Sequence, residues 1–211
     1  MARTHTGRSD AIVLDWAYHG TTQELIDLSP YKYKRKGGKV GRRMSSKRSF
    51  PTAIARRRLA GRRTRQTLRR KHRRADRGNG QPGSRPGTVH AESIPSVAGQ
   101  VFLPEGYLKE VYALVRAAGG VCVADEVQVD ARVVPDIVTM GKPIGNGHPM
   151  AALVTTKEIA TSFNNGMEYF NTFGGNPVSC AAGLAVLDVI ERDGLRQNAA
   201  EVGTYLMDRF P

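Results

Sequence analysis

The sequence predicts an α/β fold in which a mostly parallel sheet is flanked by helices. Four short apolar runs are typical of buried strands, and they lie at residues 11–14, 121–124, 136–140 and 150–155. Three stretches have apolar residues at helical spacing, and they lie at residues 104–118, 177–192 and 198–210. Strands of this buried kind, connected through helices, indicate a parallel sheet.

The first strand, Ala11 to Leu14, is followed by a loop that contains Trp16, Tyr18, His19 and Gly20. The stretch from Pro104 to Ala118 is expected to be a helix that crosses back to the central strand. Its apolar residues follow the spacing i, i+3, i+4, i+7, and Gly119-Gly120 ends it. These apolar residues are Leu108, Val111, Tyr112 and Val115.

The central strand, Val121 to Ala124, is followed at once by Asp125. The strand at 136–140 leads to Lys142, in a turn rich in Gly and Pro. The carboxyl ends of parallel strands open into the crevice where α/β folds bind ligands, so this acid and this lysine could face each other across a cofactor. Pyridoxal phosphate (PLP) requires such a pair. The alternative is a capping Asp and a solvated surface Lys, which the spacing alone favours.

The C-terminal third is predicted to contain a strand at 150–155, a short helix at 157–163 and two longer helices. The helix at 177–192 has Pro177 in its first turn and Leu184, Leu187 and Ile190 on one face. The last helix, 198–210, is amphipathic. The loop at 172–176 combines the Thr172 hydroxyl with exposed amides, a combination that suits a phosphate group.

The two cysteines, Cys122 and Cys180, both lie in apolar surroundings within predicted elements, so we expect core residues rather than a disulfide or a metal site. Neither a metal site nor a membrane-spanning segment is predicted, because no apolar run is long enough to cross a bilayer. Asp10, close to Arg3 and Arg8, makes the N-terminal stretch a poor signal or transit peptide.

The net charge of +13 comes from one segment. Residues 34–89 contain sixteen Arg and five Lys against a single acid, Asp76, which gives +20 and leaves −7 for the rest of the chain. This segment has few large apolar residues, so it cannot bury enough surface to offset its ordering entropy, and we expect disorder. One hypothesis is a basic arm that binds nucleic acid or an acidic partner. The other, which we prefer, is an out-of-frame or intron-derived segment without specific nucleic-acid binding.

Three motifs in order resemble those of class-III PLP-dependent aminotransferases. They are Asp125-Glu126-Val127-Gln128, Lys142 within Met-Gly-Lys-Pro-Ile-Gly-Asn-Gly, and Asn171-Thr172-Phe173-Gly174-Gly175-Asn176-Pro177. The sequence around Lys142, and Glu168-Tyr169-Phe170 before the Asn171 motif, are most similar to one branch of this family. That branch contains ethanolamine-phosphate and 5-phosphohydroxylysine phospho-lyases and is also called alanine–glyoxylate-aminotransferase-like. The resemblance implies the large domain of a fold-type I PLP-dependent transferase.

The resemblance also implies roles for individual residues. Lys142 would form an imine with pyridoxal 5'-phosphate and act as the catalytic base, and Asp125 would keep the pyridine nitrogen protonated. Gln128 would bind the phenolic oxygen of the ring. Tyr18 would stack on the ring with His19 as its neighbour, although a core Tyr and a loop His are alternatives. Thr172 would reach the phosphate in a neighbouring subunit, which implies a homodimer.

The chain departs from the family pattern in several places. The resemblance divides it into an N-terminal piece (1–33), the basic segment (34–89) and the core of the large domain (90–211). A Gly-Phe-Gly-Arg turn is absent after Val129, and Arg132 does not replace its arginine. Glu92 matches an acidic family position with altered neighbours. The family is roughly twice as long, with a C-terminal small domain and a Gly-rich phosphate-binding cup before Tyr18, so a fragment or defective copy is expected.

The expected function is therefore that of a PLP-dependent transaminase or phospho-lyase acting on a small primary amine, which could be phosphorylated. The alternatives are a catalytically inactive fragment and a basic polyanion-binding protein that uses residues 34–89. By family resemblance the compartment would be the mitochondrion, with the cytoplasm as the alternative.

Overall fold

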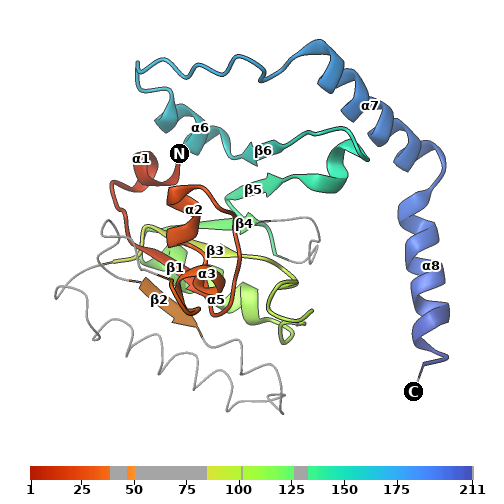
Figure 1. The fold of residues 1–211 in the computed structure, drawn as a ribbon, viewed down its shortest axis with the longest axis horizontal. Coiled ribbons are helices and arrows are strands. Elements are labelled where there is room, and N and C mark those ends of the chain that lie inside the picture. Colours follow the sequence, from red (N-terminus) through yellow and green to blue (C-terminus); the bar gives the residue numbers. More distant parts are fainter. Residues whose placement is uncertain (39–46, 51–84, 101, 126–132, 211) are drawn as a thin grey trace. The chain divides into compact units, whose positions relative to one another are not determined.

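The computed structural model describes residues 1–38, 47–50, 85–100, 102–125 and 133–210. The chain forms two compact units (Figure 1). The first, here called the sheet unit, comprises Met1–Thr139 and Leu153–Met167. The second, the helical unit, comprises Met140–Ala152 and Glu168–Pro211.

The strands form a six-stranded sheet in the order β2-β1-β3-β4-β5-β6. Its strands are β1 (Ala11–Leu14), β2 (Lys47–Phe50), β3 (Thr88–Ala91), β4 (Val121–Asp125), β5 (Ile137–Met140) and β6 (Ala152–Thr155). The pairs β1–β2, β1–β3, β3–β4 and β4–β5 are all parallel. The predicted α/β fold, a mostly parallel sheet with flanking helices, is confirmed.

Successive residues of a strand point to opposite faces of the sheet, and in β1 and β4 both sets are buried. Helices therefore cover both faces. On one face Ile12, Val89 and Cys122 pack against the inner side of α5 (Tyr107–Ala117). The buried residues of this helix are Tyr107 and the four that the helical spacing predicted. On the other face Val13 packs against Leu28, and Val123 lies in a cluster with Ile159.

The strands β4 and β5 pair in register although the connection between them is short. Val123 lies opposite Ile137 and Asp125 opposite Thr139. The Asp136 carboxylate supports this pairing, since it accepts a hydrogen bond from the Cys122 amide at 2.7 Å and forms an ion pair with Arg116 at 2.8 Å. The lost Gly-Phe-Gly-Arg turn therefore does not prevent β5 from joining the sheet.

Three short helices near the start of the chain have no counterpart in the sequence predictions. They are α1 (Ala2–Thr6), α2 (Gln23–Asp27) and α3 (Pro30–Tyr33). α1 contacts α6 (Lys157–Phe163), where His5 Nδ1 lies 2.8 Å from Ser162 Oγ. The bounds of α6 agree with the predicted short helix.

Two parts of the basic segment form strands, so the expected disorder does not hold there. Residues 47–50 form β2 and pair with β1 through backbone hydrogen bonds, which do not require an apolar side-chain pattern. Residues 88–89 begin β3, inside the boundary set at 89. Residues 39–46 and 51–84, on which most of the prediction rests, lie outside the described residues.

The helical unit contains a 3₁₀ turn, η2 (Lys142–Gly145), and two helices, α7 (Pro177–Arg192) and α8 (Leu195–Met207). α7 contacts the segment after η2 at Gly183, where an added Cβ would come within 2.7 Å of Met150. One turn earlier, Ser179 Oγ lies 2.8 Å from His148 Nε2. The absent side chain at Gly183 is thus what allows the close approach of Met150.

The apolar face that the sequence predicts for α7 is largely exposed in the structure. Leu184 and Leu187 of α7 are exposed, because the side of the helix that is covered is the one with Ser179 and Gly183. Cys180 is also exposed, which corrects its prediction as a core residue, whereas Cys122 is fully buried as expected.

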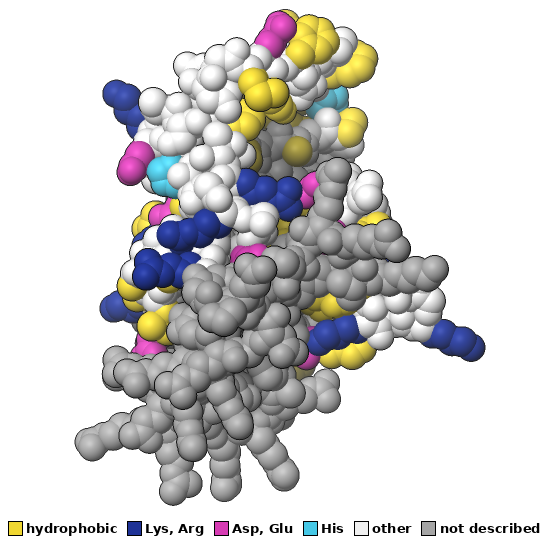
Figure 2. Space-filling view, turned by 90° about the vertical axis from the view of Figure 1, so that its left-hand side faces the viewer, with side chains coloured by type: hydrophobic (Ala, Val, Ile, Leu, Met, Phe, Trp, Pro, Cys, Tyr) yellow, Lys and Arg dark blue, Asp and Glu magenta, His cyan; other side chains and the backbone are white. Residues whose placement is uncertain are grey.

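Other exposed apolar side chains are Tyr169, Phe170 and Phe173 in the loop before α7 and Phe210 after α8. Hydrophobic side chains are visible at the top of the surface in Figure 2. Among the described residues, no helix has the length and apolar character needed to cross a membrane.

Candidate active site

Asp125 is the last residue of β4, and its carboxylate is held by two side chains of the sheet unit. Oδ2 lies 2.7 Å from His19 Nδ1, and Oδ1 accepts a hydrogen bond from the Thr139 hydroxyl at 3.1 Å. Its side chain keeps 35% of its surface accessible. Burial raises the pKa of Asp125. The hydrogen bond and the charge of His19, together with the hydrogen bond from Thr139, outweigh this effect, so the pKa lies below its ordinary value of 3.8. The carboxylate is therefore ionised and still accessible.

His19 comes from the loop after β1, and only 2% of its side chain is accessible. Its backbone amide donates to Ser29 Oγ at 2.9 Å, and the Ser29 hydroxyl donates in turn to the Leu25 carbonyl at 2.6 Å. Ser29 is fully buried, so the start of α3 fixes the loop. Among the described residues, His19 Nε2 is the buried side-chain atom without a hydrogen-bond partner.

His90, in β3, lies beside His19 with ring centroids 5.9 Å apart and an edge-to-face angle of 61°. Burial and, to a smaller extent, the nearby His19 lower the pKa of His90 from 6.5 to about 3, although Asp125 acts in the opposite direction. His90 is therefore neutral at physiological pH. The two imidazoles and the Asp125 carboxylate thus form one cluster within the sheet unit.

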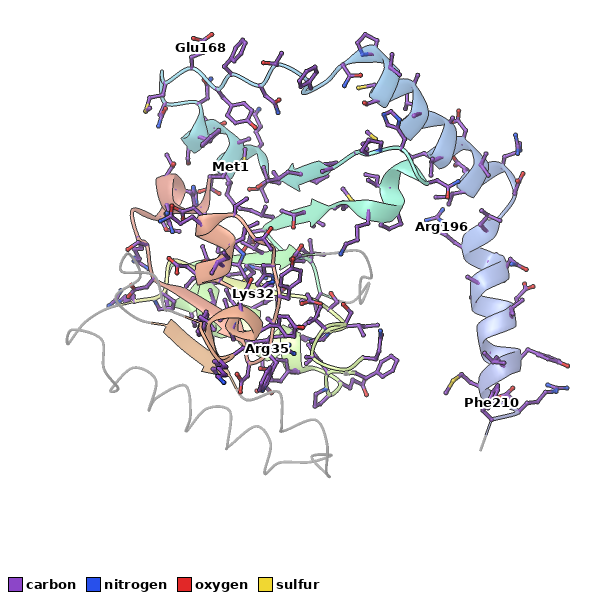
Figure 3. All side chains as sticks on the ribbon, in the orientation of Figure 1. Met1, Lys32, Arg35, Glu168, Arg196 and Phe210 are labelled. Atoms are coloured by element: carbon purple, nitrogen blue, oxygen red, sulfur yellow. The ribbon has the colours of Figure 1, made fainter. Side chains whose placement is uncertain are left out.

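Tyr18 is partly buried, and its ring contacts the ring of Tyr31 edge to face at a centroid distance of 5.9 Å. The Lys32 ammonium lies 5.6 Å from the centre of the Tyr18 ring, and the Arg35 guanidinium lies 4.0 Å from that of Tyr31. Figure 3 labels these two cations at the end of α3. The aromatic ring is thus available at the same loop as His19.

Glu92 follows β3 and is 9% exposed. Its Oε1 accepts from the Tyr18 amide at 3.3 Å, and its Oε2 accepts from the Ser96 amide at 2.9 Å. Both oxygens thus serve to hold loops. In this structure the candidate Glu92 supports the Tyr18 loop.

Lys142 belongs to the helical unit and follows β5 by two residues. Its side chain is exposed, and its backbone has a φ of 46°, in the left-handed region that residues other than Gly rarely adopt. Backbone strain of this kind is concentrated at functional sites. The predicted lysine is thus presented by a strained turn.

Thr172 lies in the exposed loop before α7. Asn171 Oδ1 accepts from the Gly174 amide at 3.1 Å, and Asn176 Oδ1 caps α7 by accepting from the Ser179 amide at 2.9 Å. The loop is therefore ordered by its own amide side chains, and the Thr172 hydroxyl is not required for that.

The structure brings Asp125, His19 and the Tyr18 loop together in the sheet unit, while Lys142 and Thr172 lie in the helical unit. Gln128 and Arg132 lie outside the described residues. The sequence predictions missed Thr139 and His90, although the in-register position of Thr139 opposite Asp125 is a signal that strand pairing could have supplied.

The family model for class-III aminotransferases matches residues 1–210. The chain belongs to the class-III aminotransferase family. The match spans nearly the whole chain, so the resemblance inferred from three motifs is confirmed.

Curated relatives match this chain over different lengths. A Drosophila melanogaster protein named alanine–glyoxylate aminotransferase 2-like is 41% identical over 99% of this chain and 46% of its own length. The human mitochondrial alanine–glyoxylate aminotransferase 2 is 53% identical over 57% of this chain and 26% of its own length. The chain thus spans about half, or less, of the length of these curated relatives.

Solved structures of a phospholyase and of an aminotransferase have the same fold. An Arthrobacter phospholyase in complex with phosphoethanolamine matches 99% of this chain and 52% of its own, with 33% identity and a TM-score of 0.82. A taurine:2-oxoglutarate aminotransferase from Bifidobacterium kashiwanohense, in complex with PLP and glutamate, matches 98% of this chain and 50% of its own. At 23% identity and a TM-score of 0.81, that likeness concerns the fold alone. PLP, the cofactor expected from the motifs, is thus a cofactor of this fold.

The residues of the sheet unit fit a pyridine ring with a protonated nitrogen. The ionised, partly accessible Asp125 can accept an N–H from such a ring, because a carboxylate oxygen held by one donor retains a further lone pair. The Tyr18 ring is partly buried and lies in the same loop as His19, which binds Asp125. The donor set is therefore chemically suited to PLP.

Proposed function

We propose that this chain is the cofactor-binding part of a PLP-dependent enzyme that acts on a small primary amine. The observation that supports this most strongly is Asp125, whose ionised carboxylate remains accessible at the end of β4 between His19 and Thr139. An ion pair with a pyridinium nitrogen would be strengthened by this partly buried setting. The Lys142 motif three residues after Thr139 supplies the amine that the same chemistry requires.

The proposed contacts follow from the chemistry of each side chain. Asp125 would bind the ring nitrogen, Tyr18 would cover one ring face and Gln128 would donate to the phenolic oxygen. Thr172 would bind the phosphate of a cofactor held by a second copy of the chain, so the active form would be a homodimer. Lys142 Nζ would hold the cofactor covalently.

Bound PLP supplies a cationic ring that withdraws electrons from the substrate carbon bearing the amine. Lys142 Nζ, once replaced by the substrate amine, would accept the proton that this carbon releases. Asp125 would stay ionised throughout, because its hydrogen bonds to His19 and Thr139 lower its pKa. The exposed, strained turn of Lys142 would let its amine move between the two tasks.

The proposed substrate is a phosphorylated small amine, and the reaction a phospho-lyase elimination. The support is the phosphoethanolamine-bound phospholyase, which at 33% identity matches nearly the whole chain. A transaminase is the second candidate, favoured by the 41% identical relative named alanine–glyoxylate aminotransferase 2-like. Since the human relative is named mitochondrial, we also propose a mitochondrial location.

The test is a product assay on the full chain with PLP. Phosphoethanolamine should release inorganic phosphate, whereas alanine with glyoxylate should yield pyruvate and glycine if the chain is a transaminase. Lys142→Ala should abolish either product, and Lys157→Ala, an exposed lysine in α6, should not. If the wild type formed neither product, the catalytically inactive alternative would replace this proposal.

A further inference from the structure

We propose that a cavity at the start of α5 binds a small carboxylate with one apolar ring or branched chain, and that the carboxylate lies at the first turn of this helix. The cavity lies in the sheet unit and has a volume of about 220 Å³. The described residues that line it are 93–94, 102–109 and Val133. None of them is a proposed cofactor-binding residue, so this second site does not depend on the proposed function.

The first turn of α5 has backbone amides that lack acceptors. The residue before the helix is Gly106, which has no side chain to cap it. The Tyr107 amide donates to the Pro104 carbonyl at 3.0 Å. The next two amides, of Leu108 and Lys109, have no acceptor among the described residues. Two adjacent free N–H groups at a helix N-terminus attract an anion, because the helix dipole adds a partial positive charge there.

The hydroxyl of Tyr107 is an independent donor at the same cavity. Tyr107 lines the cavity and is only 7% exposed, yet its hydroxyl forms no hydrogen bond with another described residue. Its oxygen is not fully enclosed, in contrast to His19 Nε2, so a ligand in the cavity can reach it. Burial raises the pKa of Tyr107 to about 12, so the hydroxyl keeps its proton at physiological pH. A ligand oxygen would remove the cost of leaving this buried donor unpaired.

The charges at the cavity suit a singly charged anion. Lys109 lines the cavity, is exposed, and forms no ion pair within the part of the chain that the structure describes. Glu105 also lines the cavity, but it is exposed and has an interaction partner of its own, so its repulsion of an anion is weakened. The other described lining residues are uncharged. One cation beside one acid favours a carboxylate over a phosphate dianion.

The remaining lining is mostly apolar and limits the size of the ligand. Ile94, Leu103 and Val133 are part of it. Leu103 and Val133 pack against the core cluster that contains Tyr107 and Leu108, so this wall is held by the core of the sheet unit. An apolar cavity of about 150 Å³ takes up one benzene molecule. A cavity of about 220 Å³ therefore has room for one ring and its carboxylate.

Benzoate is the probe, because it combines one ring with one carboxylate. Its Kd is measured on the full chain without PLP by isothermal titration calorimetry, and two partial analogues are measured beside it. Benzamide keeps the ring without the charge, and acetate keeps the charge without the ring. We expect benzoate to bind about tenfold more tightly than either analogue. In NMR spectra, benzoate should shift the amide signals of Leu108 and Lys109.

Two variants test the donors separately. Tyr107→Phe keeps the ring in the core and should weaken benzoate binding by about tenfold, because a hydrogen bond to a charged group is lost. Its stability toward urea should equal or exceed that of the wild type, since an unpaired buried hydroxyl is removed. Lys109→Gln should weaken binding about two- to fivefold, as expected for an exposed charge. The matched control is Tyr205→Phe, at an exposed tyrosine of α8, which should leave the Kd unchanged.

The proposal would be overturned by an equal benzoate affinity of wild type and Tyr107→Phe, or by benzamide binding as tightly as benzoate. A wild type that shows no saturable benzoate binding would also contradict it. Asp125→Asn tests whether benzoate enters the cofactor site instead. Loss of binding in that variant, with Tyr107→Phe unaffected, would place the ligand there and refute the proposal. All of these measurements are made without PLP, so the proposed function can hold or fail separately.

Discussion

Nδ1 of His19 lies 2.7 Å from Oδ2 of Asp125, so that a loop residue and the last residue of the central strand form one hydrogen-bonded pair. The two are 106 residues apart in the chain. The pair exists because β1 and β4 both adjoin β3 in parallel, which brings the segments after their carboxyl ends to the same edge. The fold itself thus assembles the part of the candidate site in the sheet unit.

The Thr139 hydroxyl should contribute less than His19 to the low pKa of Asp125. Its bond is longer, at 3.1 Å, and it carries no charge. Thr139→Val removes the hydroxyl and keeps the β-branched shape that suits a strand. We expect the Asp125 pKa to rise in this variant, measured by NMR titration of the carboxyl carbon, and to stay at its lowered wild-type value in Thr139→Ser, which keeps the hydroxyl. A larger rise than in His19→Gln would contradict the assigned order.

His90 should make the stability of the fold depend on pH. Its folded pKa of about 3 lies below the ordinary 6.5, so the unfolded chain binds the proton more readily. The stabilisation is therefore fully present above about pH 6.5 and is lost as the pH falls toward 3. Urea unfolding across this window should show a smaller loss in His90→Gln than in wild type. Equal slopes in the two proteins would mean that His90 is not buried in its neutral form.

Gly120 should not tolerate a side chain. A Cβ there would lie 2.7 Å from the Pro86 carbonyl oxygen and 3.0 Å from Val115 Cγ1, and the backbone oxygen cannot move aside easily. We expect Gly120→Ala to lower the free energy of unfolding by about 1–3 kcal/mol. Gly203→Ala is the matched control, since nothing lies within 4 Å of its Cβ position in α8. That variant should be neutral or gain about 0.5–1 kcal/mol of helix stability.

The two cysteines should differ sharply in reactivity toward a thiol reagent. Cys122 is fully buried, and burial together with Asp136 raises its pKa to about 12, so its thiolate is scarce. Cys180 is exposed on α7. Mass spectrometry after brief alkylation should find Cys180 modified and Cys122 intact, and Cys180→Ser should block labelling of the native chain. Rapid labelling of Cys122 would show that β4 is not held in the core.

The elements with local signals were predictable from the sequence. The bounds of β1, α6 and α7 agree with prediction because an apolar run, the Thr156 cap and the Asn176-Pro177 start are all encoded within a few residues. β2 could not be predicted in this way, because the sequence Lys-Arg-Ser-Phe lacks strand periodicity and its pairing with β1 is a tertiary effect. The same limit explains the short helices α1 to α3.

The candidate site was predictable as a set of residues and not as a set of contacts. The motifs identify Asp125, Tyr18 and His19 as site residues, yet no pattern along the chain indicates that His19 binds Asp125. Thr139 could be placed beside Asp125 only through the pairing of β4 with β5. The exposed sides of α7 and α8 were also not predictable, since helical spacing identifies an apolar face without showing which side another element covers. Gly183, which marks the covered side of α7, has no apolar side chain to indicate it.

The most direct measurement is to add PLP to the full chain, reduce with borohydride and locate any covalent adduct by mass spectrometry. The proposed function predicts one adduct, on Lys142, that is absent from Lys142→Ala and retained in Lys157→Ala. It also predicts weaker labelling in Asp125→Ala, because the ring nitrogen loses its partner. Labelling spread over several exposed lysines, unaffected by Lys142→Ala or Asp125→Ala, would contradict a specific PLP site in this chain.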